Sequence, residues 1–277
     1  ARGIALLWAR PWGWPGAETV YGDYDGDAVS DLAVYDQSSG FWYIITMGDV
    51  VLAWDRPWGW TDAITVPGDY DGDGINDLCV YDQNTGYWYV QTLAGTVLAW
   101  EQPWGWPGAT TVPGDYDGDG KSDMAVYDQP TGAWYVWSQA KGQALIWARP
   151  WGWTGAVPVP GDYDGDGYAD LAVFDTITGY WYVWSEVKGV ALAWAQNWGW
   201  PGANPPWPWP GMRARARPPW PWSWCGAARI SSPTTGSSWP PIPRASAAAV
   251  WPGRPGFTPS VCSRCGRETP ARARSIR

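Results

Sequence analysis

The side chains best placed for chemistry in this sequence are aspartates that recur in four nine-residue segments. In each segment, carboxylates stand at positions 1, 3, 5 and 9, as in the DYDGDGKSD that begins at Asp115. We call these segments loops 1 to 4; they cover residues 23–31, 69–77, 115–123 and 162–170. A tight loop turns alternate carboxylates toward one centre, and Ca²⁺ takes six to eight oxygen ligands. Four carboxylates this close also repel one another unless a cation offsets their charge.

The spacing therefore predicts one calcium site in each loop, three to four ions per chain. Gly at position 6 supplies the bend, and the carbonyl of position 7 can add a ligand. Loop 1 has Ala28 at position 6, where a bend with positive φ costs about 1 kcal/mol or more, so its site should be the weakest. The expected ligands are Asp23, Asp25, Asp27, Val29, Asp31, Asp69, Asp71, Asp73, Ile75, Asp77, Asp115, Asp117, Asp119, Lys121, Asp123, Asp162, Asp164, Asp166, Tyr168 and Asp170.

The loops are not EF-hands, because their position 12 is apolar (Val34, Val80, Val126 and Val173) where an EF-hand has a bidentate Glu. Catalysis is not expected either. The chain has no His, and its clustered aspartates are committed to the ion, which leaves no pair of groups with separated pKa values.

The elements that position these loops repeat with them. The tripeptide WGW begins at Trp12, Trp58, Trp104, Trp151 and Trp198, at intervals of 46, 46, 47 and 47 residues. Each unit carries short, alternating apolar segments such as LAVYD and a WYV segment that follows a Gly-containing turn, which is a hairpin pattern. We expect an all-β fold of propeller-type blades, each with three to four short antiparallel strands. The units would cover about 1–50, 51–96, 97–143 and 144–189, with the start of a fifth reaching residue 203.

On these motifs, the first 200 or so residues resemble the bacterial FG-GAP/VCBS-type repeats, a group to which the integrin α-chain propellers are related. The matching pattern is VPGDYDGDG followed by D-x-AVYD, a turn and WYV, as in the unit around loop 3. The resemblance implies calcium bound in loops between strands of propeller blades, with the ion rigidifying the blade.

The chain holds 28 Trp, and aromatic residues at the same place in every unit favour packing between blades. Trp faces also stack on sugar rings. If some stack on a ligand, the candidates are those of the WGW turns: Trp58, Trp60, Trp104, Trp106, Trp151 and Trp153. Cys79 replaces an Ala found in the other units and is expected to be a small buried residue.

Residues 204–277 have a different composition. Residues 201–277 contain 16 Pro and 11 Arg against one acid, Glu268, whereas residues 1–200 carry 26 acidic and 7 basic residues, a net charge of −19. This Pro/Arg/Trp-rich tail has no strand or helix period, and we expect it to be disordered or the product of a frameshift. A linker and a polyanion-binding arm are the alternatives. Its CxxC, Cys262 to Cys265, lacks the further ligands of a zinc site.

Three functions remain open on the sequence. The first is an extracellular or cell-surface module for adhesion or ligand binding that structural calcium ions stabilise. The second is a structural array that self-associates through open blade edges, and the third is a carbohydrate-binding propeller. The partner would be a protein or a glycan. The acidic body is not expected to bind nucleic acid, and no stretch is apolar enough to span a membrane.

Overall fold

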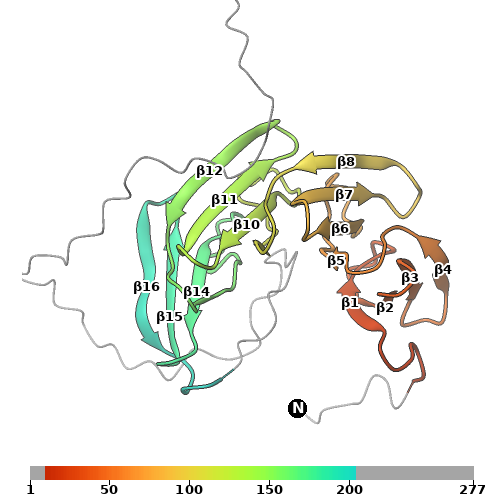
Figure 1. Ribbon diagram of the computed structural model, residues 1–277, viewed down its shortest axis with the longest axis horizontal. Coiled ribbons are helices and arrows are strands. Elements are labelled where there is room, and N and C mark those ends of the chain that lie inside the picture. The colour runs from red at the N-terminus through yellow and green to blue at the C-terminus, as the bar shows by residue number, and fades with distance from the viewer. Residues whose placement is uncertain (1–9, 204–277) are drawn as a thin grey trace, which may run out of the picture. The chain divides into compact units, whose positions relative to one another are not determined.

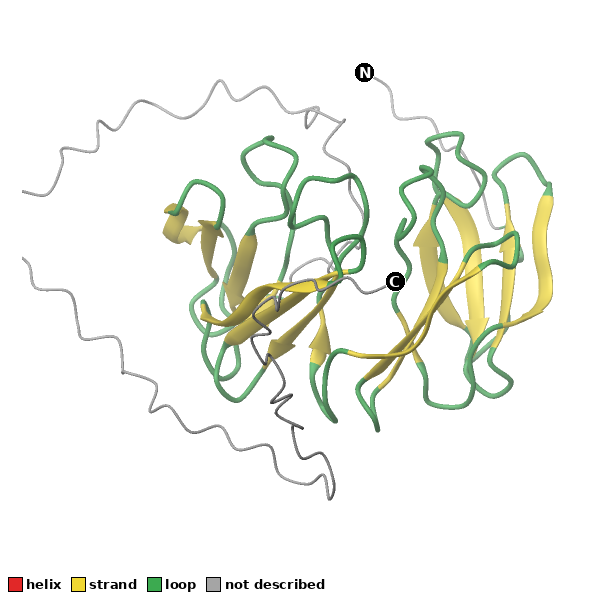
Figure 2. Cartoon of the chain, turned by 90° about the horizontal axis from the view of Figure 1, so that it is seen from above, coloured by secondary structure: helices red, strands yellow, loops and turns green. Residues whose placement is uncertain are grey.

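Residues 10–203 of the 277 are described by the computed structural model, which contains strands and loops but no helix in this range (Figures 1 and 2). The tail whose disorder or frameshift origin is predicted above lies outside the described residues. No helix in the described part of the chain is long and apolar enough to cross a bilayer.

The sixteen strands form four antiparallel sheets of four strands each, arranged as the blades of a β-propeller. Blade 1 consists of β1 (Glu18–Gly22), β2 (Asp31–Asp36), β3 (Phe41–Ile45) and β4 (Val51–Pro57). Blade 2 consists of β5 (Ile64–Thr65), β6 (Leu78–Asp82), β7 (Tyr87–Gln91) and β8 (Val97–Pro103). Blade 3 consists of β9 (Thr110–Thr111), β10 (Met124–Asp128), β11 (Ala133–Ser138) and β12 (Gln143–Pro150). Blade 4 consists of β13 (Val157–Pro158), β14 (Leu171–Asp175), β15 (Tyr180–Ser185) and β16 (Val190–Asn197).

Within each blade the strands are paired in sequence order, so every blade is a simple meander of hairpins. The second strand is buried on both faces; β6, for example, buries Leu78, Cys79, Val80 and Tyr81 completely. The third strand alternates, with Trp88 and Val90 of β7 buried between partly exposed neighbours. The all-β propeller expected from the sequence is confirmed, with four strands in every blade, and Cys79 is a buried packing residue.

The blades are offset from the sequence units. The V-L-A-W segment that opens the second unit is β4, which pairs with β3 and closes blade 1. The WGW turn then leads into blade 2. Each blade is therefore made from the end of one unit and the start of the next.

The WGW turn is fixed by buried side chains of the blade before it. The indole Nε1 of Trp88 donates to the carbonyl oxygen of Trp104 at 2.5 Å, and the Tyr81 hydroxyl donates to the carbonyl oxygen of Trp106 at 2.9 Å. Gly105 lies between them at φ 143°, and a Cβ there would come within 2.5 Å of the Tyr81 hydroxyl oxygen. The turn therefore requires glycine at this place.

The same turn attaches each blade to the next. Trp104, at the end of blade 2, is buried, and its indole Nε1 donates to the carbonyl oxygen of Tyr135 in blade 3 at 3.4 Å. Trp104 also belongs to a hydrophobic core cluster that contains Trp88 of blade 2 together with Met124 of blade 3. Packing between blades therefore accounts for this tryptophan.

Candidate metal centres

Each aspartate loop connects the first and second strands of one blade. Its conformation is set by the carboxylate at position 1, which accepts backbone N–H groups from its own loop. In loop 3, Asp115 Oδ1 accepts from Gly118 at 2.7 Å and Asp115 Oδ2 from Gly120 at 2.8 Å. An aspartate that folds the chain back in this way holds a tight turn without help from other elements.

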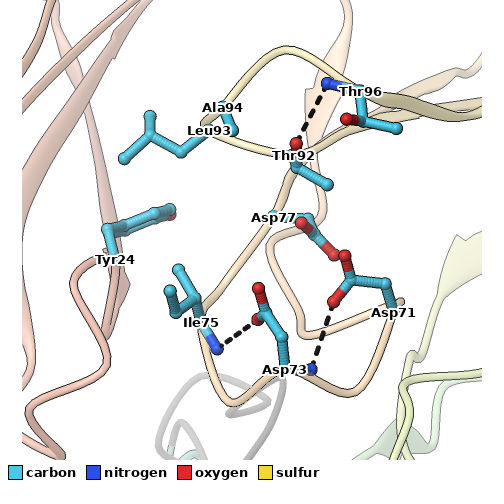
Figure 3. Close-up of a pocket in the computed structure, with 9 residues that line it drawn as sticks. All are labelled: Tyr24, Asp71, Asp73, Ile75, Asp77, Thr92, Leu93, Ala94 and Thr96. Atoms are coloured by element: carbon cyan, nitrogen blue, oxygen red, sulfur yellow. Dashed lines mark hydrogen bonds between the residues drawn. The ribbon is translucent and has the colours of Figure 1, made fainter.

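The carboxylates at positions 3 and 5 bond the backbone two residues on. In loop 2, Asp71 Oδ1 accepts from the Asp73 N–H at 3.1 Å, and Asp73 Oδ1 accepts from the Ile75 N–H at 2.8 Å (Figure 3). These hydrogen bonds order the side chains while a carboxylate still has lone pairs for a cation.

The carboxylate at position 9 is the most buried member of the set in loops 2 to 4. Asp123 is 1% exposed, and its Oδ2 accepts the Tyr116 N–H at 2.9 Å. Burial raises the pKa of Asp123 to about 8, and the charges of Asp117, Asp115 and Asp119 add to the rise, although the Tyr116 hydrogen bond lowers the pKa. For the same leading cause, the pKa of the position 9 carboxyl rises to about 6 in Asp31, about 7 in Asp77 and about 6 in Asp170. The loops therefore concentrate negative charge that the protein does not fully offset.

The structure brings three predicted ligands together in every loop. Oxygen atoms of positions 1, 3 and 9 lie within 4.8 Å of one another in loops 2, 3 and 4, as Asp69, Asp71 and Asp77; Asp115, Asp117 and Asp123; and Asp162, Asp164 and Asp170. Position 5 is not part of these three triads.

Loop 1 differs from the other three. Its triad is Asp23, Asp25 and Asp27, so position 5 takes part and the buried Asp31 does not. The bend that the sequence predicts is confirmed, since Ala28 has φ 66° where Gly74, Gly120 and Gly167 have φ between 84° and 93°. A residue with a Cβ is strained at that angle, in keeping with the prediction that site 1 is the weakest.

Successive loops are joined to each other. The N–H of the residue at position 8 donates to the carbonyl oxygen of position 1 in the preceding loop, at 2.6 Å in all three cases: Asn76 to Asp23, Ser122 to Asp69 and Ala169 to Asp115. The Tyr168 ring at position 7 of loop 4 covers Gly118 of loop 3, where a Cβ would come within 2.5 Å of the ring. At Gly118, both this neighbouring ring and the positive φ of 73° therefore favour glycine.

The residues present fit a hard divalent cation. All side-chain donors are oxygens, the kind of ligand that Ca²⁺ prefers. In Asp117 and Asp164 the Oδ1 atoms are buried without a hydrogen-bond partner, whereas the Oδ2 atoms pair with Lys141 and Lys188. A buried carboxylate oxygen without a partner is costly, and a bound cation would remove that cost.

Comparison with known families agrees with this geometry. Residues 69–126 and 115–173 each match the FG-GAP-like repeat, from loop 2 into β10 and from loop 3 into β14. The chain carries FG-GAP-like repeats. The two matches begin at position 1 of loops 2 and 3, so the FG-GAP-like unit includes the aspartate loop and the buried second strand.

Other comparisons add little. No curated protein matches the chain. Among solved structures, a protein of unknown function from Bacteroides caccae is similar, at 14% sequence identity with a TM-score of 0.44. The match covers 68% of this chain and 63% of that protein, so the chain spans less than two thirds of its length.

The tryptophans singled out for ligand stacking lie mostly inside the FG-GAP-like repeats. Trp58 and Trp104 are buried at 9% exposure, while Trp60, Trp106, Trp151 and Trp153 are half-buried against the hydrophobic cores. Burial leaves Trp58 and Trp104 little free ring face. Their role in stacking a ligand stays a prediction.

Exposed tryptophans include Trp14, Trp198 and Trp200 of the first and last WGW turns. A further set lies on the fourth strand of each blade: Trp54, Trp100, Trp147 and Trp194, at 61–64% exposure. The alternation of V-L-A-W could have revealed them, since Ala99 is buried in β8 and the next side chain must point the opposite way. A second set missed from the sequence is Lys141 and Lys188, which pair with loop carboxylates. The change of spacing from 46 to 47 residues was the available signal.

Proposed function

We propose that this protein is a non-catalytic, calcium-binding module of the cell surface or extracellular space, in which the ions stabilise blades that present a surface for adhesion or ligand binding. The observation that carries the proposal is the set of carboxylate triads in loops 2 to 4, each within 4.8 Å and each with a buried position 9 aspartate.

When bound, Ca²⁺ would supply positive charge and accept several oxygen ligands at one centre. In loop 3 the residues that would hold it are Asp115, Asp117 and Asp123, with Asp119 and the carbonyl of Lys121 as further donors. These residues also order the loop backbone, and the loop contacts the next blade. A structural role for the ion follows from this position.

Equilibrium dialysis against ⁴⁵Ca²⁺ tests the proposal. We expect three to four ions per chain at millimolar calcium, and poor competition by Mg²⁺, which demands a smaller octahedral shell. Chelation should loosen the blades and shift tryptophan emission to longer wavelength, with recovery on adding Ca²⁺. Fewer than two ions per chain, or EDTA-treated protein with unchanged emission and melting, would overturn the structural role.

A carbohydrate ligand is the second candidate, favoured by the exposed tryptophans. Trp100 lies edge-on to Tyr89, with ring centroids 5.2 Å apart, and Trp60 lies edge-on to the same tyrosine at 4.8 Å. The same arrangement recurs in every blade, and it holds the exposed indole in a fixed orientation. Each blade also has a β-bulge beside this tryptophan, with a positive φ at the next residue: Asp55, Glu101, Ala148 and Ala195.

Bulges often re-aim a side chain, and an ordered indole face suits stacking on a pyranose ring. A glycan array would separate this candidate from protein adhesion. Replacement of Trp100 and Trp147 by Ala should abolish any glycan signal, whereas replacement of the exposed Ile177 should leave it unchanged. Mass measurement over a dilution series would reveal the third function, a self-associating array.

A further inference from the structure

The FG-GAP-like repeats differ in length at one turn. From the buried Trp of the third strand to the exposed Trp of the fourth, Trp88 to Trp100 in blade 2 is one residue shorter than Trp134 to Trp147 in blade 3. The turn of blade 2 closes with the Gly95 N–H donating to Thr92 O, whereas the turn of blade 3 closes with the Gly142 N–H donating to Ser138 O. Blades 1 and 4 follow blades 2 and 3 respectively. The 47-residue spacing therefore arises in this turn.

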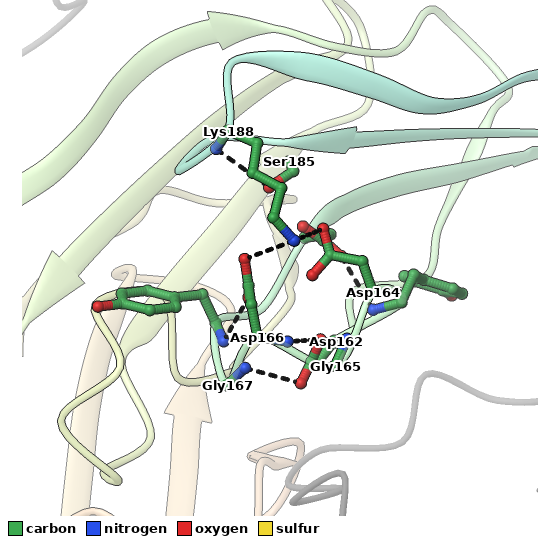
Figure 4. Close-up of polar contacts among 10 residues, drawn as sticks. Asp162, Asp164, Gly165, Asp166, Gly167, Ser185 and Lys188 are labelled. Carbon is green, nitrogen blue, oxygen red and sulfur yellow. Dashed lines mark hydrogen bonds and ion pairs between the residues drawn. The ribbon is translucent and has the colours of Figure 1, made fainter. Parts of the chain in front are cut away.

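In both longer turns, the residue before the glycine is a lysine, and its side chain reaches the loop of the same blade. Lys141 Nζ lies 2.9 Å from Asp117 Oδ2 of loop 3. Lys188 Nζ lies 2.6 Å from Asp164 Oδ2 and 3.2 Å from Asp166 Oδ2 of loop 4 (Figure 4). The Asp117 side chain is 5% exposed and that of Lys141 is 46% exposed, so the ammonium enters from the solvent side.

In blade 2 the same space is open. A pocket of about 540 Å³ lies between loop 2 and the turn of residues 92–96, lined by Asp71, Asp73 and Asp77 on one side and by Thr92, Leu93, Ala94 and Thr96 on the other (Figure 3). No basic residue lines this pocket. The corresponding turn of blade 1 carries Asp49, which pairs with Arg10 and adds no positive charge to loop 1.

We propose that Lys141 and Lys188 are built-in counter-cations of loops 3 and 4. When no metal is bound, their ammonium groups pair with the loop carboxylates, and they compete with Ca²⁺ for these carboxylates. The turn of blade 2 has no such lysine, so loop 2 lacks this counter-cation; the side chain of Lys121 from loop 3 lies against Gly72 of loop 2. This inference rests on the proposed calcium binding. If the ammonium occupies a site about nine-tenths of the time, the apparent Kd for Ca²⁺ rises about tenfold, because only the vacant fraction binds.

Calcium titration of the full chain, followed by NMR, tests the assignment. The amides of Ile75 and Lys121 report loops 2 and 3, since each donates to the position 5 carboxylate of its own loop. In the unaltered protein, loop 2 should bind Ca²⁺ about tenfold more tightly than loop 3. Lys141→Met should tighten loop 3 to about the level of loop 2, and loop 2 should change only by the smaller, indirect effect that its contact with loop 3 transmits. Arg149→Met is the matched control, because it removes one positive charge from β12 that pairs with Glu186 and not with a loop.

The melting temperature measured in EDTA is a second test, and it should change in the opposite direction to the calcium affinity. Lys141→Met should lower the melting temperature of metal-free protein while raising calcium affinity, and Lys141→Arg should keep both near their original values. A lysine that merely packs would lower stability without a gain in affinity. Unchanged calcium affinity of loop 3 in Lys141→Met, with loop 2 binding normally, would overturn the inference. Absence of calcium binding in every loop would instead refute the proposed function.

The reciprocal experiment moves the lysine. Insertion of Lys between Ala94 and Gly95 gives blade 2 the longer turn, and it should weaken calcium binding at loop 2 about tenfold. Insertion of Ser at the same place is the control for turn length and should leave the affinity near its original value. Equal weakening by Lys and Ser would mean that turn length, and not the ammonium, sets the affinity, which contradicts the proposal.

Discussion

The backbone N–H of Ser122 in loop 3 donates a 2.6 Å hydrogen bond to the carbonyl oxygen of Asp69 in loop 2. Ser122 lies between two expected ligands of loop 3, Lys121 and Asp123, and it contacts Asp69, the first expected ligand of loop 2. Ordering of one loop by a cation therefore bears on the conformation of its neighbour.

We expect calcium binding in neighbouring loops to be coupled. Asp117→Asn, which disables loop 3, should weaken calcium binding at loop 2 by about fivefold, within the usual range of coupling between sites. Asp164→Asn disables loop 4, which contacts loop 3 but has no bond to loop 2 among those described, and it should have little effect there. Titration followed at the Ile75 amide compares the two variants. Equal effects from both would contradict coupling through the contact.

Disabling one site should reduce stability only when calcium is present. A ligand that binds the native state at 100 times its Kd stabilises it by about 2.7 kcal/mol, so Asp71→Asn should lose about that free energy of unfolding in saturating Ca²⁺. In EDTA the variant should be as stable as the unaltered chain or more so, because one repelling charge is gone. Urea denaturation measures both conditions. Asp62→Asn, an exposed turn residue outside the loops, is the control and should change neither.

Relief of backbone strain should strengthen loop 1. Ala28 has φ 66° at position 6, where the other loops have Gly. Ala28→Gly should raise the free energy of unfolding by up to about 1 kcal/mol and tighten calcium binding at loop 1. The reverse change at the same position of loop 4, Gly167→Ala, should destabilise by a similar amount. A loss of stability in Ala28→Gly would show that chain entropy outweighs strain at this bend.

The metal-free protein should become more stable as the pH falls. Burial holds the pKa of Asp77 at about 7 and that of Asp123 at about 8, against an ordinary value of 3.8. Between pH 4 and 8 the folded chain therefore binds more protons than the unfolded chain, and stability decreases as the pH rises through this range. Denaturation in EDTA at a series of pH values should show this slope, and Asp123→Asn should flatten it. With Ca²⁺ bound the slope should reverse, because protons compete with the ion.

The Tyr81 hydroxyl and Gly105 should be coupled in stability. Gly105→Ala should destabilise by several kcal/mol, since its Cβ would meet the hydroxyl oxygen at 2.5 Å. Tyr81→Phe should cost about 1–3 kcal/mol, because the carbonyl of Trp106 loses its donor. The double variant should be more stable than the sum of the two losses predicts. Blade 4, which has Phe174 at the equivalent place beside Gly199, shows that a blade tolerates the ring without its hydroxyl. A strictly additive result would mean that the clash is relieved elsewhere.

The sequence predicted the parts of the structure that are local and repeated. The aspartate spacing and the glycines of the bend specify each loop within nine residues, and the short apolar run LCVYD specifies the strand β6. The alternation expected for this strand is wrong, because β6 is buried on both faces. The ion pair between loop 3 and the turn that joins the third and fourth strands was not predictable in this way. Lys141 and Asp117 are far apart in the chain, and the pairing of β10 with β11, in which Met124 lies opposite Trp137, brings the turn that carries Lys141 beside loop 3.

Which tryptophans are buried and which are exposed was also not predictable from the sequence. The sequence placed the aromatic residues in strands and turns, but Trp104 and Trp100 are both followed by polar or turn residues and look alike in composition. What separates them is that Trp104 donates to a carbonyl of the next blade, while Trp100 stands on the outer side of a bulged strand. Burial of this kind depends on the neighbouring repeat.

The bonds that join one blade to the next, from the Trp104 indole to Tyr135 and from Ser122 to Asp69, all connect successive repeats. Stability in such an arrangement is close to a sum of terms, one for each repeat and one for each junction. A gene that duplicates or deletes one whole repeat would then change the length of the protein without creating a mismatched surface, because every junction uses the same donor and acceptor. Repeat number can thus vary between related chains while each blade keeps its own loop and turn.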